Sequence, residues 1–165
     1  MINDMKLDIT NQIRKNQRYK DYYQELKLLE KDRVFCKHDF DHFLDVARIT
    51  VLLANKNNIS VDEDIIYAAA LLHDMGRITE YKDGTPHHIA SCDIAREILE
   101  DIDCEVEKKE VIISLIRCHR NPENPPGSLQ FFFRNADKIS RKCYACDARD
   151  KCNWPDEKKN LDIFF

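Results

Sequence analysis

The sequence predicts an all-α fold for this chain of 165 residues. Apolar residues recur with the period of an α-helix in several successive segments, which is the main sequence signal of amphipathic helices. Helix start and stop signals separate these segments, such as the capping-box pattern Ser-Val-Asp-Glu at residues 60–63 and the helix-stopping Pro122. A chain of this length is expected to form one domain around a single core.

The composition excludes several classes of protein. A hydrophobic content of 43% excludes a wholly disordered chain. The longest apolar run is too short to cross a bilayer, and residues 1–6 carry charge where a signal peptide needs an apolar core. Seven cysteines, mostly unevenly spaced, favour a reducing compartment over a disulfide scaffold. We therefore expect a cytoplasmic protein without a membrane segment, and the sequence indicates no oligomeric state.

The first expected helices lie in residues 7–31, where apolar residues such as Ile13 and Leu26 follow helical spacing among many charged and polar residues. We interpret this segment as an amphipathic packing arm, with closure over a substrate as the alternative.

The next expected helix runs from about residue 39 to residue 57 and carries His42 within its apolar surface. Asp39 and Asp45 lie three residues on either side of His42. Either carboxylate is therefore expected to orient the His42 ring.

A third helix is expected to end at the residues His-Asp-Met-Gly-Arg, positions 73–77. The apolar, Ala-rich run before them permits close helix packing, and Gly76 is expected to end the helix in a left-handed turn. This ending places the imidazole of His73 and the carboxylate of Asp74 near a cavity, which suggests a metal site.

Residues 77–86 are expected to form a polar loop between two groups of ligand candidates, well placed to contact a substrate. Thr85 and Pro86 then supply an N-cap and a favourable first position for a helix that begins with His87 and His88.

Two further helices are expected to complete the chain's histidine and aspartate pattern. One starts near residue 106 and stops at His119, before Pro122. The other, from residue 129 to about residue 142, is capped by Ser128 and carries Asp137.

In chain order these residues read His42, His73-Asp74, His87, His119 and Asp137. This order resembles the HD-domain superfamily of metal-dependent phosphohydrolases over about residues 36–138. The resemblance implies one HD-domain helical bundle, with a helical arm in residues 1–35, a core in 36–142 and a short cysteine-containing tail in 143–165.

The resemblance also implies a metal-ligand set. His42, His73, Asp74 and Asp137 are expected to bind a first metal, and His87 and His119 are expected to complete a second site with Asp74 as the bridge. The family's usual spacing selects His87, because it lies four residues before the small pair at 91–92, and His88 is the alternative.

Further roles are expected for residues around this ligand set. Asp74, Arg77 and His88 are the expected catalytic residues, and His88 is a candidate contact to a substrate phosphate. Arg77, Lys82 and Lys138 are the expected substrate-binding residues, with a solvated surface charge as the alternative for Arg77 and Lys82.

The tail contains a second constellation of potential ligands. Cys143 and Cys146 are separated by two residues, a spacing that suits a tetrahedral ion, and Cys152 follows. Cys36 is the candidate for the fourth ligand, because it precedes His42 by as many residues as Cys143 follows Asp137. The prediction is a structural zinc ion or, as the alternative, an iron–sulfur cluster, weighed against free thiols; the other cysteines are interpreted as ordinary small residues.

Mixed imidazole and carboxylate ligation suits Fe, Mn, Zn, Co or Ni, and a bound cation of this kind activates water for attack on phosphorus. The formal net charge of −4 argues against general nucleic-acid binding, so the expected substrate is a nucleotide or another small phosphate ester. Two alternatives are a di-iron oxygenase of the same superfamily and a non-catalytic module that senses a nucleotide or redox state.

Overall fold

A computed structural model of the chain describes residues 5–163, so the outer ends of the predicted arm and tail, residues 1–4 and 164–165, lie outside the described residues. Over the described range the α-helices are α1 (Asp8–Lys15), α2 (Gln17–Leu29), α3 (Phe40–Lys56), α4 (Glu63–Leu72), α5 (Arg77–Asp83), α6 (His87–Glu100), α7 (Val106–Cys118) and α8 (Leu129–Ile139). The same range contains no strand, so the all-α prediction is confirmed. It also contains no helix with the length and apolar character that a bilayer crossing requires.

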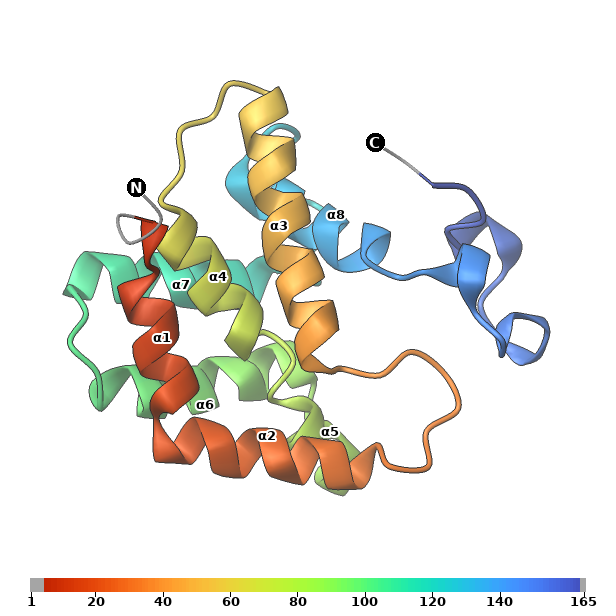
Figure 1. Cartoon of the computed structure of the whole chain (residues 1–165), viewed down its shortest axis with the longest axis horizontal. Helices are drawn as coiled ribbons and strands as arrows, with labels where there is room; N and C mark the ends of the chain where they lie inside the picture. Colours follow the sequence, from red (N-terminus) through yellow and green to blue (C-terminus); the bar gives the residue numbers. More distant parts are fainter. Residues whose placement is uncertain (1–4, 164–165) are drawn as a thin grey trace.

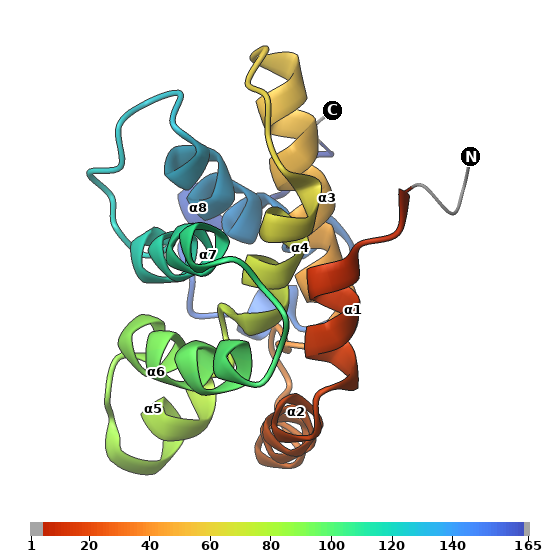
Figure 2. The same ribbon diagram turned by 90° about the vertical axis from the view of Figure 1, so that its left-hand side faces the viewer.

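Helix α4 lies at the centre of the bundle and packs against α1, α3 and α7. Figure 1 shows α1, α3 and α4 upright, with α2, α6 and α7 crossing below and behind them. In the view turned by 90°, α6 and α7 lie side by side and α5 sits against α6 (Figure 2). The three alanines of α4, Ala68 to Ala70, are fully buried, and their small side chains allow these neighbours to approach closely.

The N-terminal arm is part of the core. Ile13 of α1 and Leu26 of α2 have no exposed surface. The carboxylate of Asp64, on α4, accepts hydrogen bonds from the backbone N–H groups of Ile9 and Thr10, both at 2.8 Å. Because these N–H groups lie in the first turn of α1, a side chain from another helix caps this helix, which fixes the arm to the bundle.

The helix caps agree with the sequence prediction at one position and differ at two. Ser128 caps α8 as expected, accepting from the Phe131 N–H at 3.1 Å. Helix α4 is capped by Asp62 instead of the predicted Ser60. Thr85 does not cap α6; Pro86 occupies the N-cap position, and the Glu80 carboxylate from α5 accepts from the His87 N–H at 3.5 Å.

The segment after α4 differs from the expectation in two respects. Residues 77–83 form the short helix α5 instead of a polar loop. Gly76 is not left-handed, since its φ is −67°, and it serves as the N-cap of α5. The left-handed glycine is Gly84, with φ 83°, which ends α5.

Gly76 is required by close packing. A Cβ atom at this position would lie 2.2 Å from the His87 carbonyl oxygen and 2.4 Å from the Ser91 backbone nitrogen. Its own N–H donates to Ser91 Oγ at 2.8 Å, and that hydroxyl donates to the His73 carbonyl at 2.6 Å. The turn after His73 therefore lies directly against α6.

The tail after α8 contains three short 3-10 turns, at Cys143–Ala145, Arg149–Lys151 and Asp156–Lys158. It extends to the side of the bundle (Figure 1). The Asn160 amide returns to the end of α8 and donates to the Lys138 and Arg141 carbonyls at 2.7 and 2.8 Å.

Candidate metal centre

The six sequence-predicted ligands come together from five helices. His42 lies on α3, His73 and Asp74 directly follow α4, His87 begins α6, His119 ends α7 and Asp137 lies on α8. All six side chains are buried, and His73 is 0% and Asp74 is 1% exposed. The helix termini therefore deliver polar groups to one point inside an otherwise apolar core.

The first group of ligand atoms belongs to His42, His73, Asp74 and Asp137, which lie within 4.8 Å of one another. Asp74 Oδ2 is 3.5 Å from His42 Nε2 and 3.2 Å from His73 Nε2. Asp137 Oδ1 is 3.4 Å from His42 Nε2 and 3.7 Å from His73 Nε2. Two imidazoles and two carboxylates thus face a common centre.

The second group consists of Asp74, His87 and His119, whose ligand atoms also lie within 4.8 Å of one another. Asp74 Oδ1 is 3.4 Å from His87 Nε2, and His87 Nε2 is 3.2 Å from His119 Nε2. The two oxygens of Asp74 therefore face different groups, which is the arrangement of a bridging carboxylate.

Hydrogen bonds fix the orientation of all four imidazoles. The Nδ1 atoms of His73 and His119 face the carbonyls of Ala70 and Ile116, at 2.7 and 2.5 Å. Nδ1 of His87 faces the Glu80 carboxylate at 3.1 Å. Because carbonyl and carboxylate oxygens only accept, each Nδ1 carries a proton, and Nε2 is the nitrogen that faces the centre and is available to a metal.

The ring of His42 is oriented by Ser140. The Ser140 hydroxyl donates to the Asp137 carbonyl at 2.7 Å, so it accepts from His42 Nδ1 at 3.1 Å. The two aspartates that were predicted to orient this ring have other partners. Asp39 caps α3 by accepting a hydrogen bond from the His42 N–H, and Asp45 forms an ion pair with Lys142. The expectation that one of these aspartates orients the ring is therefore wrong.

The centre favours positive charge. Burial alone lowers the pKa of His73, but Asp74 and Asp137 raise it to about 10. Burial alone raises the pKa of Asp74 and of Asp137, yet the neighbouring histidines hold both well below the ordinary value. Two ionised carboxylates inside the core need compensating positive charge, which the His73 imidazolium supplies in this structure and a bound cation can supply in its place.

Two features show that the residues fit a metal. His73 Nε2 is a buried polar atom without a hydrogen-bond partner within residues 5–163. The Nε2 lone pairs of His87 and His119 point at each other across 3.2 Å, an arrangement that a cation between them relieves. Burial and the charge of His73 lower the pKa of His119 to about 3, so this ring stays neutral, as a metal ligand must.

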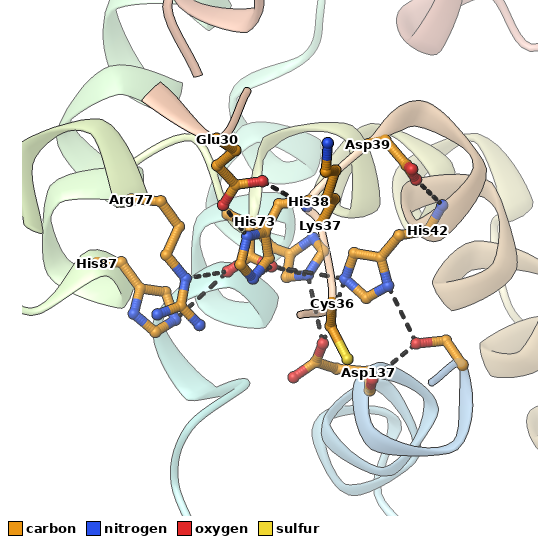
Figure 3. A network of polar contacts seen from close by, with 12 residues as sticks. Glu30, Cys36, Lys37, His38, Asp39, His42, His73, Arg77, His87 and Asp137 are labelled. Atoms are coloured by element: carbon orange, nitrogen blue, oxygen red, sulfur yellow. Dashed lines mark hydrogen bonds and ion pairs between the residues drawn. The ribbon is translucent and has the colours of Figure 1, made fainter. Parts of the chain in front are cut away.

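Sequence reasoning missed two side chains at this centre. The buried His38 donates from its Nδ1 to Glu30, and its Nε2 lies 3.7 Å from Asp74 Oδ2. Arg141 Nη2 lies 3.1 Å from His42 Nε2 and 3.9 Å from Asp74 Oδ2. Figure 3 shows His38, His42 and His73 converging with Asp137 in this network. The spacing of four residues between His38 and His42 was the available signal, but it has meaning only on a helix, and His38 precedes α3.

The predicted catalytic and substrate-binding residues have different surroundings. Arg77 Nε donates to Asp74 Oδ1 at 3.3 Å, and its Nη1 donates to Glu80 at 2.6 Å. His88 is half-buried, with its ring centroid 6.3 Å from that of His119. Lys82 instead pairs with Glu25 of α2.

Lys138 is exposed and belongs to a group of basic side chains. Burial lowers its pKa, and the charges of Arg134 and Arg120 lower it further. Arg120 also lowers the pKa of His88, after burial. The charge of Arg120 thus acts on both His88 and Lys138, and we call Arg120, Arg134 and Lys138 the basic rim.

The four cysteines of the predicted second cluster line one cavity, together with Arg33, Phe35, Arg149, Asn153, Trp154 and Lys159. Burial raises the pKa of Cys36, and the neighbouring thiols Cys143 and Cys146 raise it further, against the charge of Arg141. The segment before α3 and the tail are therefore adjacent.

The sequence matches a family model described as the HD domain over residues 39–142. A Clostridium beijerinckii protein, named only as an uncharacterized protein, is 42% identical over 159 residues, which cover 96% of this chain and 100% of that protein. Ribonuclease Y of Oleidesulfovibrio alaskensis is 26% identical over 106 residues, which cover 64% of this chain but 18% of that protein.

A crystal structure of a predicted HD superfamily hydrolase from an uncultured Thermotogales bacterium has a similar fold. The TM-score is 0.56 at 22% sequence identity, and the match covers 79% of this chain and 65% of that chain. At this identity the likeness concerns the fold alone.

Proposed function

Because this chain belongs to the HD domain family, we propose that it is a metal-dependent phosphohydrolase that acts on a nucleotide or another small phosphate ester. The observation that carries the proposal is the position of Asp74, whose two oxygens face two separate groups of imidazole lone pairs. His42, His73, Asp74 and Asp137 would hold one metal, and Asp74, His87 and His119 a second. This mixed donor set suits Fe, Mn, Zn, Co or Ni.

Bound divalent cations lower the pKa of coordinated water and neutralise a phosphoryl oxygen, which is the chemistry that hydrolysis of a phosphate ester needs. The chain's own groups support the same reaction. Arg77 stays charged at the edge of the centre, because Asp74 and Glu80 raise its pKa against the effect of burial. Its guanidinium is suited to orient a phosphate.

The basic rim supports an anionic substrate. Arg120 and Lys138 follow the ligands His119 and Asp137 directly in the sequence, so their charges lie near the second and first groups. The half-buried His88 has its ring beside that of His119, is affected by the charge of Arg120, and would contact the phosphate. The formal net charge of −4 favours a small substrate over a long nucleic acid, although the name of the relative Ribonuclease Y also indicates cleavage of a phosphate ester.

The test is phosphate release by purified protein that is stripped with a chelator and reloaded with each metal in turn. Nucleotides and p-nitrophenyl esters of phosphate serve as substrates. Asp74→Asn should lose both bound metal and phosphate release. The loss of each should exceed the roughly 10–100-fold loss that is typical when a residue that only supports a metal ligand is replaced. Asp93→Asn, an equal charge change at an exposed position of α6, is the control.

Two outcomes would contradict the proposal. Oxygen consumption by the iron-loaded protein without phosphate release would replace the hydrolase with an oxygenase. Full metal loading without turnover of any substrate would favour a module that only binds its ligand.

A further inference from the structure

The cavity between the segment before α3 and the C-terminal tail has a volume of about 230 Å³. Four thiols line it: Cys36, Cys143, Cys146 and Cys152. None of the four forms a disulfide. Cys36 lies on the same stretch of chain as His38, at the edge of the polar network of the metal centre (Figure 3). Cys36 and the three tail cysteines, which lie 107 or more positions further along the sequence, thus line the same cavity.

The tail has a defined conformation although it has no apolar core of its own. Among its described residues, 143–163, only Cys143 and Ala148 are buried. The 3-10 turns place the thiols, since Cys143 begins one turn, Cys146 ends it and Cys152 ends the next. Small loop-rich segments of this kind are usually held by a cross-link, and a metal is one such cross-link.

The spacing of the thiols does not suit a single zinc ion. At a Zn–S distance of about 2.3 Å, a tetrahedral site holds its sulfurs about 3.8 Å apart. Within residues 5–163 the groups of three or more ligand atoms within 4.8 Å of one another are both at the histidine–aspartate centre, and no such group contains a cysteine. As the side chains stand, no three of the thiols are close enough together to hold one zinc ion, and a larger ligand spans them with less movement.

The charges around the cavity favour a negatively charged ligand. Arg33, Arg149 and Lys159 line it, and no Asp or Glu does so among the described residues. An iron–sulfur cluster with four thiolates is an anion larger than one ion, and four cysteines, two of them separated by two residues, are its usual ligands. Phe35 and Trp154 supply the apolar part of the lining.

We propose that Cys36, Cys143, Cys146 and Cys152 bind an iron–sulfur cluster in this cavity. Each thiol loses its proton and becomes a ligand to iron. The cluster joins the segment before α3 to the tail, which explains how a tail without a core is held. The site is separate from the histidine–aspartate centre and does not depend on the proposed hydrolysis.

The experiment is anaerobic reconstitution of the full chain with iron and sulfide. It is carried out in an Asp74→Asn background, so that iron at the histidine–aspartate centre does not enter the count. We expect the broad visible absorption of thiolate-bound iron clusters, with iron and acid-labile sulfide in equal amounts. Zinc without labile sulfide, or no metal retained after desalting, would overturn the proposal.

Cys36→Ser is the decisive variant, because the three tail cysteines alone could collect iron nonspecifically. It should lose both the absorption and the sulfide, and Cys146→Ser, in the tail, should do the same. Cys104→Ser, in the loop between α6 and α7, should retain both. Far-UV circular dichroism confirms that each variant is folded, and a Cys36→Ser protein that keeps the cluster would contradict the site.

Discussion

The hydrogen-bond acceptors that orient each imidazole determine which ring nitrogen faces the centre and is available to a metal. Carbonyls that follow from local helix geometry hold His73 and His119, whereas partners from other elements hold His42 and His87. Such supporting groups set the tautomer and basicity of a ligand.

Ser140→Ala tests this at a single residue. The variant removes the acceptor of His42 Nδ1, so the ring can rotate or present the wrong tautomer. We expect a roughly 10–100-fold loss of metal affinity, measured by competition with a chelator. Ser114→Ala, a matched change on α7, should leave the affinity unchanged; an equal loss in both variants would contradict the role of Ser140.

Glu30 provides a pH-dependent contribution to stability. Burial raises the pKa of its carboxyl, but hydrogen bonds from His38 and Tyr81 lower it from 4.5 to about 2. Because the folded-state pKa is depressed, the carboxylate stabilises the fold above its unfolded-state pKa, and this contribution is lost as the pH falls toward 2.

Denaturant unfolding of chelator-treated protein between pH 5 and pH 2 measures this effect. As the pH is lowered, we expect the free energy of unfolding to decrease less steeply in Glu30→Gln than in the unsubstituted protein. The exposed Glu107→Gln should follow the unsubstituted protein. Parallel curves for all three proteins would show that Glu30 makes no such contribution.

At the scale of elements, the turn between α4 and α5 carries the tightest geometric requirement. Gly76→Ala forces a Cβ onto backbone atoms of His87 and Ser91, so α6 must move together with the ligand at its first position. We expect a loss of stability of about 1–3 kcal/mol, the usual cost of overpacking, together with loss of metal from the second group.

Gly84→Ala is the matched control at the other end of α5. A Cβ there meets nothing within 4 Å, and only the left-handed φ of 83° is unfavourable. We expect a cost of about 1 kcal/mol and normal metal content. Thermal unfolding and elemental analysis measure both quantities, and equal effects of the two variants would contradict the packing argument.

The elements that sequence patterns predicted well are those with long apolar stripes. The helix around His42 and the helix around Asp137 were placed within a few residues, because burial of one face repeats with the helical period. Helix α5 was missed because its seven residues are too few to display that period. Gly76 was misassigned because its close contact is with α6, and no local pattern encodes a partner that is fifteen residues away.

The same limit applies within the site. His42, His73, Asp74, His87, His119 and Asp137 were found because their order resembles a known superfamily, whereas His38 and Arg141 belong to no local motif. Their positions depend on how the segment before α3 meets the end of α8. Arg141 illustrates this, since it donates to the Lys37 carbonyl at 3.0 Å across more than 100 positions of sequence.

At the scale of the whole molecule, we expect metal binding and folding to be coupled. The ligands come from five helices, so the unfolded chain offers no preformed centre, and a metal that binds only the native state stabilises it. At a free metal concentration of about 100-fold the Kd, one site contributes about 2.7 kcal/mol.

We therefore expect the Tm to rise with metal concentration in the unsubstituted protein. Differential scanning calorimetry at several concentrations checks this. Asp93→Asn should behave in the same way, and Asp74→Asn should show little rise. A Tm that does not depend on metal concentration in the unsubstituted protein would refute the coupling.

The distribution of the ligands along the chain also affects biosynthesis. Asp137 is the last of the six to be synthesised, and it belongs to a helix that packs on α3, where the first ligand lies. A nascent chain that lacks α8 already carries the four histidines of the ligand set and Asp74 but cannot complete the first group. Complete coordination of a metal at that group therefore has to follow translation of α8.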